Sequence, residues 1–278
     1  MKLKNFTLGL ICSLITIQTF SQEKSFKFNN KNQYRFGLGV EYFKTLDLQT
    51  SPNLYQSLGP HISLNYSRIL KQDMLNFGLN LNAGNLKPNN GDYRKIYITE
   101  TDFYGVETIE ATELILFQMA LDLSIGYVHK LKSISNETRN IYLGGNVQEH
   151  LDFAPGMFNM GTINYLSFII VGRAERRLKQ GRMLTGEFDF PLASVVTRLP
   201  YHNAPAIPGK SDLETFFTHH NFFESVNHFQ NFNLSLAYRF WSGKKMAVDV
   251  TCKTYWLHYN KPEHLTKTGN QLILGINF

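Results

Sequence analysis

The sequence ends on the stretch Thr268-Gly269-Asn270-Gln271-Leu272-Ile273-Leu274-Gly275-Ile276-Asn277-Phe278, whose residues alternate in character. Successive side chains of a β-strand point to opposite faces, so residues two apart share a face. The stretch therefore predicts a strand with one apolar face and one face that is mostly small or polar. The apolar face holds Leu272, Leu274, Ile276 and Phe278, and the other holds Gln271, Ile273, Gly275 and Asn277.

The same two-residue period recurs along the chain. It is clearest at 75–82, where large apolar residues alternate with asparagines and one glycine. Burying such a polar face in the core of a soluble protein would be costly unless every amide found a partner. We expect about ten strands, and a split in the seventh or a strand from the lead-in 23–33 would give twelve. The ten lie near 34–44, 58–69, 75–82, 117–127, 140–148, 163–178, 182–195, 232–240, 246–259 and 268–278.

A closing strand of this kind, ending on Phe278, resembles the C-terminal strand of Gram-negative outer-membrane β-barrel proteins. The resemblance implies an all-β fold, a transmembrane up-and-down antiparallel β-barrel. It also implies that Phe278 is an assembly signal read by the barrel assembly machinery, and that the barrel lies in the outer membrane among its lipids and lipopolysaccharide. Short connections are expected after the even-numbered strands and mostly longer ones after the others, as in barrels with periplasmic turns and extracellular loops.

The first residues have the pattern of a secretory signal peptide. Lys2 and Lys4 precede an apolar run at 6–20 that is shorter than the roughly 20 residues of a membrane-spanning helix. Thr19 and Ser21 are small residues at the positions that a signal peptidase recognises. We therefore expect residues 1–21 to be a signal peptide and 22–278 to be a single outer-membrane β-barrel domain.

Composition narrows the class further. Removing Lys2 and Lys4 with the signal peptide lowers the formal charge from +6 to +4, which is too mild to indicate a nucleic-acid partner. No later segment approaches twenty continuous apolar residues, so helical membrane spans are excluded. Cys252 would be the only cysteine left, so no intrachain disulfide is expected. Nothing in the composition points to a cofactor.

Charged residues on the inward faces of the predicted strands are the strongest indication of a site. A turn centred near Gln180 sets Arg173 opposite Glu187, and a turn at Gly243 sets Arg239 opposite Asp249. An uncompensated buried charge is costly, so we expect ion pairs in the barrel interior. The residues concerned are Arg173, Glu175, Arg177, Glu187, Asp189, Arg239 and Asp249. They favour a packed polar interior over a selectivity constriction in a narrow pore, and ten strands are too few for a general sugar porin.

A possible catalytic pair is His61-Ile62-Ser63, which is similar to the His-x-Ser pair of outer-membrane phospholipases and lipid A deacylases. That resemblance implies a lipid-facing hydrolytic site. Here His61 and Ser63 share the polar face of their strand with Asn65 and Ser67, so we favour a lumen-lining role. A ten-stranded barrel is also similar to the omptin proteases, but the Asp-x-Asp pattern of their rim is missing from the strand tops of this sequence.

The longest insertion, near 197–231, could hold a short extracellular helix. Ser211 and Glu214 have the spacing of a capping box. His220, Glu224 and His228 then follow at intervals of four, which makes them candidates for a transition-metal site. We favour a surface helix without a metal.

These patterns together predict an integral outer-membrane β-barrel with a structural, binding or narrow-channel role and no enzymatic activity. The expected contact surfaces are the two large extracellular loops, near 84–112 and 197–231. The alternative that remains open is an outer-membrane lipid hydrolase that uses His61 and Ser63.

Overall fold

The computed structural model describes residues 31–91, 93, 95–101, 103–113, 116–154, 163–198, 207–218, 221–243 and 245–278. The expected signal peptide, 1–21, lies outside these residues. Among the residues described, no helix is long and apolar enough to cross a membrane.

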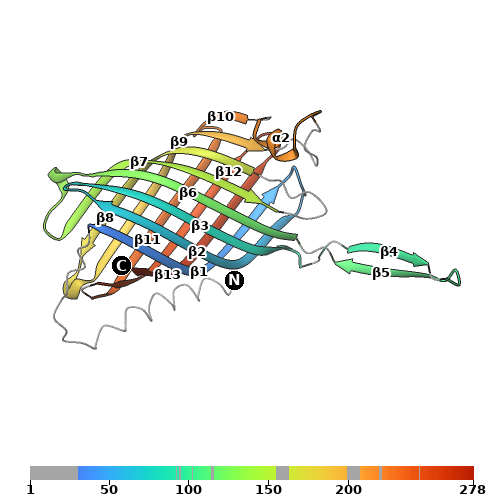
Figure 1. Cartoon of the computed structure of the whole chain (residues 1–278), viewed down its shortest axis with the longest axis horizontal. Helices are drawn as coiled ribbons and strands as arrows, with labels where there is room; N and C mark the ends of the chain where they lie inside the picture. The colour runs from blue at the N-terminus through green and yellow to red at the C-terminus, as the bar shows by residue number, and fades with distance from the viewer. Residues whose placement is uncertain are drawn as a thin grey trace.

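Long antiparallel strands make up most of this structure (Figure 1). The first five are β1 (Asn32–Asp47), β2 (Leu54–Ile69), β3 (Asp73–Pro88), β4 (Lys95–Thr101) and β5 (Glu107–Glu113). The next four are β6 (Leu116–Lys130), β7 (Arg139–Phe153), β8 (Ile163–Arg177) and β9 (Met183–Arg198), and a helix, α2 (Asp212–Thr218), follows. The last four are β10 (Asn221–Ser225), β11 (Phe229–Ser242), β12 (Ala247–Tyr259) and β13 (Leu265–Asn277).

Ten of these strands close into a barrel. The order β9-β11-β12-β13-β1-β2-β3-β6-β7-β8 is completed by a pairing of β8 with β9. The first and last strands of the chain are neighbours, with Arg35 opposite Asn277 and Asp47 opposite Leu265. Closure pairs the backbone groups around the ring, as a sheet needs when it spans hydrocarbon. The predicted ten-stranded antiparallel barrel is therefore confirmed.

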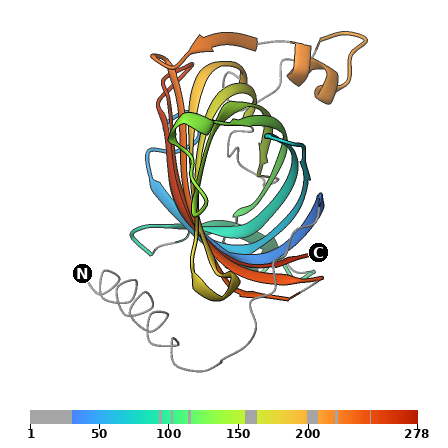
Figure 2. The ribbon, with the colours of Figure 1, turned by 90° about the vertical axis from the view of Figure 1, so that its left-hand side faces the viewer.

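The two ends of the barrel differ (Figures 1 and 2). One end, the short-turn end, carries the connections at 70–72, 131–138, 178–182 and 243–246, together with the start of β1 and the C-terminus. The opposite end, the loop end, carries the β4–β5 hairpin, α2 and β10. This is the asymmetry that the spacing of the predicted strands indicated.

The outward faces of the strands carry the large apolar side chains. Leu38, Leu64 and Leu236 point away from the barrel, and Leu236 is 53% exposed. Glu41, His61 and other inward residues are buried. An apolar outer wall is the surface that lipid requires, so the predicted assignment of the two faces is confirmed.

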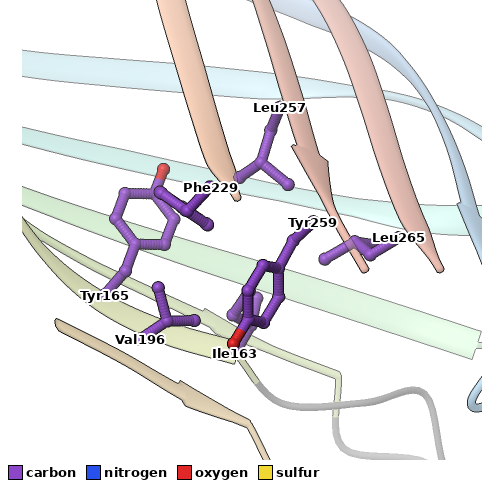
Figure 3. Packing of buried hydrophobic residues seen from close by; sticks show 7 residues of the cluster. All are labelled: Ile163, Tyr165, Val196, Phe229, Leu257, Tyr259 and Leu265. Carbon is purple, nitrogen blue, oxygen red and sulfur yellow. The ribbon is translucent and has the colours of Figure 1, made fainter. Parts of the chain in front are cut away.

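The interior is not uniformly polar. An apolar cluster lies inside the barrel towards the loop end (Figure 3). A β-bulge helps to build it: Phe168 pairs with Ala193, but Ile169 pairs with Pro191, so β9 changes parity between them. Val196 therefore points inward, and Pro191 at the bulge has no N–H to leave unpaired. The members of the cluster are Ile163, Tyr165, Val196, Phe229, Leu257, Tyr259 and Leu265.

The region predicted as a polar loop at 84–112 is structured instead. β3 continues to Pro88, and β4 and β5 form a separate two-stranded hairpin that projects beyond the barrel. The mixed threonines, isoleucines and glutamates of this hairpin have no lipid face and hence no clean two-residue period. That is why the sequence pattern did not reveal it.

The second large insertion contains the predicted short helix, α2. The Ser211 Oγ atom accepts a hydrogen bond of 3.2 Å from the backbone N–H of Glu214, which caps the helix. The prediction that the helical spacing continues to His228 is wrong, however. α2 ends at Thr218, and β10 pairs with β9 through contacts such as Glu224 opposite Ser194.

Candidate functional site

A polar cavity of about 260 Å³ occupies the short-turn half of the barrel. All ten barrel strands contribute to its wall. Its charged lining residues are Arg35, Arg173, Glu187, Arg239 and Asp249, accompanied by Asn65, Asn76, Asn146 and Asn277. These side chains present both hydrogen-bond donors and hydrogen-bond acceptors to the cavity.

Arg35 and Asp249 form an ion pair in this cavity, and the sequence predicted only Asp249 as a member of such a pair. Arg35 donates from Nη2 to Asp249 Oδ1 at 2.7 Å, and it also contacts Thr251 at 3.0 Å. The Nδ2 atom of Asn277 donates to Asp249 Oδ2 at 2.6 Å. Arg239 lies opposite Asp249 in the β11–β12 register, as the turn geometry indicated. The sequence pattern therefore located the carboxylate but missed Arg35, which reaches it from β1 over the intervening strand β13.

The second group of charges lies on β8 and β9. Arg173 is opposite Glu187 in register, with 3.6 Å between Nη1 and Oε2, and its Nη2 atom lies 2.9 Å from Glu175 Oε1. Asn140 and Tyr142 also donate to Glu175, each at 3.4 Å. Arg177 is exposed near the end of β8, and Asp189 lies opposite Asn233 of β11.

A dense set of buried and half-buried polar side chains lies inside the barrel between this cavity and the loop end. Asp122 accepts hydrogen bonds from His150 at 2.6 Å and Gln148 at 2.9 Å. The Tyr255 hydroxyl donates to Glu41 at 2.6 Å, and Lys267 Nζ lies 2.7 Å from Asp152 Oδ2. We call this group the lumen plug: Glu41, Gln118, Asp122, Gln148, His150, Asp152, Tyr165, Tyr255 and Lys267.

The plug leaves little room. Two spaces among its side chains are about 30 Å³ each, which is close to the volume of one water molecule. The polar residues at inward-facing positions of the predicted strands indicated that the barrel interior would be polar. The sequence did not show which of them meet, because the partners come from strands far apart in the chain.

A further buried charge ties together two connections at the loop end. Arg198 is 1% exposed and forms an ion pair with Asp47. Its Nη1 atom donates to the backbone carbonyls of Lys261 and Glu263, at 3.1 and 2.5 Å. These contacts fix the short 260–264 connection over the end of β9.

The candidate catalytic pair lies inside the barrel. His61 and Ser63 are 2% and 1% exposed, and both point into the lumen. The His61 Nδ1 atom pairs with Asn82, whereas Ser63 Oγ accepts from Arg35 at 3.4 Å. The two side chains therefore bond to different residues and face away from the lipid. A serine nucleophile needs an adjacent base and access to its substrate, and this geometry provides neither.

Of the three metal candidates, the structure describes Glu224 and His228, and neither lies in a helix. His220 lies outside the described residues. Glu224 is buried on β10, where it accepts from Lys261 at 2.8 Å and from the Tyr259 hydroxyl at 3.3 Å. His228 is exposed in the turn before β11. Within the part of the chain that the structure describes, no group of His, Cys, Asp and Glu side chains has the geometry of a metal site.

The β4–β5 hairpin is highly exposed at the loop end. Every residue of β5 is exposed, and the tip of the hairpin carries Phe103 and Tyr104 at 98% and 88% exposure. Their rings pack edge to face with centroids 5.7 Å apart. Gly105 has a φ of +78°, which a glycine adopts without strain in a tight turn. The tip therefore presents two aromatic rings to the surroundings.

Comparisons with known proteins agree with the fold. No family model and no curated protein sequence matches the chain. Among solved structures, the outer membrane protease OmpT from Escherichia coli superimposes with a TM-score of 0.53 at 10% identity, covering 92% of this chain and 99% of that one. The translocator domain of the autotransporter NalP from Neisseria meningitidis gives 0.43 at 6% identity, with 99% and 95% covered. The toluene transporter TodX from Pseudomonas putida gives 0.33 at 8% identity, with 90% and 89% covered.

The OmpT superposition is the one of these three that is close enough to support an argument. At 10% identity it establishes the fold, that of a Gram-negative outer-membrane β-barrel, and nothing about activity.

Proposed function

We propose that this chain is an integral outer-membrane β-barrel with a closed interior, and that it acts as a binding protein through its loop end. Export would follow from the signal peptide expected at 1–21. The loop end would then face the cell exterior, because up-and-down barrels of this class keep their short turns on the periplasmic side. Outer-membrane lipids and lipopolysaccharide would surround the apolar outer wall.

The observation that favours binding over conduction is the lumen plug. Its side chains are buried or half-buried and hydrogen-bonded to one another, the Lys267–Asp152 pair joins opposite sides of the barrel, and the group lies between the cavity of about 260 Å³ and the loop end. Barrels of about eight strands are filled by side chains, whereas open aqueous channels need about sixteen. With such a plug we expect no continuous water path through the lumen, which would leave the exposed β4–β5 hairpin and the insertion that holds α2 and β10 as the surfaces available for binding.

Conductance through a planar bilayer tests the closed interior. The unmodified protein should give no discrete current steps. A variant with Tyr165→Ala and Tyr255→Ala, which removes two rings from the plug, should give them. If the unmodified protein gives current steps as large as those of the double variant, the plug does not close the lumen, and the narrow channel is favoured instead.

Labelling in intact cells tests which end faces outward. In a Cys252→Ala background, Phe103→Cys at the hairpin tip should react with a membrane-impermeant maleimide. Ser133→Cys, an exposed position at the short-turn end, should react only after the outer membrane is disrupted. The reverse pattern would place the hairpin in the periplasm and overturn the proposal.

The alternative lipid hydrolase is tested directly by phospholipid release in mixed micelles. We expect no release from the unmodified protein, because Ser63 is buried in the lumen and bonded to Arg35. Release that disappears in Ser63→Ala would establish the hydrolase instead.

A further inference from the structure

We infer that the outer edge of β5 is a docking site for an extended, cationic polypeptide segment, which adds to the β4–β5 hairpin as a third strand. The inference rests on the proposed function, because it requires the loop end to be accessible from outside the cell. It specifies the chemistry of the partner and the side of the hairpin that the partner uses.

The hairpin has the backbone groups that such a partner needs. β5 pairs with β4 and with no other strand of the described chain. In an antiparallel pair, each strand directs half of its N–H and C=O groups away from its neighbour. Two-stranded sheets are only marginally stable in water, and a third strand stabilises them. The outer edge of β5 is therefore a template for strand addition.

Charge distinguishes the two edges of the hairpin. β5 carries Glu107, Glu110 and Glu113, whereas the charged residues of β4 are Lys95 and Glu100. Glutamates on an exposed edge keep it soluble and repel other acidic edges. The same charges disfavour a second copy of this hairpin and the phosphates of lipopolysaccharide as occupants. A strand with lysine or arginine side chains is the partner that remains attractive.

The spacing of the glutamates predicts the pattern of the partner. Side chains directly opposite each other on neighbouring strands are close enough to form ion pairs. Glu107, Glu110 and Glu113 are three residues apart, so a paired strand would meet them with cationic residues at every third position. Ile109 and Ala111 lie between the glutamates and would face small or apolar side chains.

The aromatic tip would extend the contact at one end of this edge. Phe103 and Tyr104 are nearly fully exposed. Large aromatic side chains often anchor protein interfaces, so these two rings are suited to contact a partner. An apolar residue beside the cationic run of the partner could cover them. The docking surface is thus defined as Phe103, Tyr104 and the β5 residues Glu107, Ile109, Glu110, Ala111 and Glu113.

Synthetic peptides test the inference with the full chain in detergent micelles. The probe is a fluorescein-labelled Lys-Val-Thr-Lys-Val-Thr-Lys peptide, and the comparison is Lys-Lys-Lys-Val-Thr-Val-Thr, which has the same composition without the spacing. Fluorescence anisotropy should show the spaced peptide binding about tenfold more tightly, the effect of three exposed cross-strand ion pairs. Equal binding of the two peptides would overturn the proposed register.

Matched variants separate a local edge from long-range attraction. Replacing Glu107, Glu110 and Glu113 together by glutamine should weaken the spaced peptide about tenfold. The control triple, Glu100→Gln, Glu137→Gln and Glu263→Gln, removes the same charge from exposed positions away from this edge and should leave binding within twofold. A similar loss in both triples would mean non-specific attraction and would refute the site.

Backbone methylation tests strand addition itself. Two versions of the spaced peptide carry N-methyl groups on alternate amides, one on each edge. One version should bind normally and the other should fail, since a single edge pairs with β5. Equal behaviour of the two versions would refute a third strand.

The cell-labelling result distinguishes the two levels of the proposal. Labelling of Phe103→Cys without peptide binding would refute the docking edge and leave the proposed function standing. No labelling of Phe103→Cys in intact cells would refute both. Intrinsic tryptophan fluorescence of each variant should match that of the unmodified protein, which shows that the barrel has folded.

Discussion

Replacing Lys267 by methionine should strongly destabilise the barrel. The Lys267 side chain is 9% exposed, and its Nζ atom lies 2.7 Å from Oδ2 of Asp152, whose own side chain is 8% exposed. The ammonium also lies 4.4 Å from the centroid of the Phe43 ring. Methionine keeps most of the volume but leaves the Asp152 carboxylate with the Gln118 amide as its remaining hydrogen-bond donor.

The expected loss follows from the burial of this pair. Breaking a buried ion pair by removing one partner costs about 3–5 kcal/mol, because the other charge stays behind uncompensated. Asp152→Asn should also destabilise, since it leaves the ammonium facing a neutral amide. In the double variant neither charge remains, so its loss should be smaller than the sum of the two by about 2–3 kcal/mol.

Urea unfolding in micelles, followed by the fluorescence of Trp241 and Trp256, measures these free energies. The control is Lys210→Met, which breaks a 3.6 Å pair with Glu214 whose two side chains are 33% and 52% exposed. That change should stay within about 0.5 kcal/mol. A loss below about 1 kcal/mol for Lys267→Met, or additive effects in the double variant, would show that the plug is hydrated and that the pair does not hold it together.

Three further predictions follow from the packing of the barrel. Gly144→Ala should lower the free energy of unfolding by about 1–3 kcal/mol, because a Cβ at this position meets the backbone of Tyr127 and Val128. The control is Gly172→Ala, whose Cβ meets no atom within 4 Å, and it should change the free energy of unfolding by no more than about 0.5 kcal/mol. Leu236→Arg, on the outward face in the middle of β11, should lower the stability in lipid vesicles by about 2–4 kcal/mol. Leu58→Arg, near the loop end of β2, should lower it by about 1 kcal/mol or less. Equal losses would contradict the lipid-facing assignment. Arg173→Met should cost about 3 kcal/mol in urea titrations, since it leaves the buried Glu175 carboxylate without its guanidinium, whereas exposed Arg177→Met should be nearly neutral.

Much of the barrel could be predicted because the bilayer imposes a simple rule. Every second residue of a spanning strand meets lipid and is mostly apolar, so the pattern at 75–82 or 268–278 identifies both the strand and its faces. The rule holds only in the membrane-spanning part. Strand ends were predicted too short, as in β2, which starts at Leu54 rather than near 58, because these ends extend beyond the lipid and lose the alternation.

The candidate site was predictable in kind but only partly in its contacts. Hairpin neighbours could be paired from turn positions alone, and Arg173 does lie opposite Glu187. Pairs between strands that are not hairpin neighbours could not be found in this way. Arg35 and Asp249 are 214 positions apart, and Lys267 and Asp152 are 115 apart. Their meeting depends on ring closure and on the stagger of every strand between them.

What the sequence by itself determined is the two-faced strand, repeated until the sheet closes, because the period of the backbone decides which residues meet lipid. Only the tertiary structure decided which inward side chains meet one another inside the barrel, that the bulge at Pro191 turns Val196 and Arg198 inward, and that β4 and β5 stand apart as an acidic hairpin. The physical reason is that alternation is a local property of one strand, whereas register and closure depend on all the strands at once.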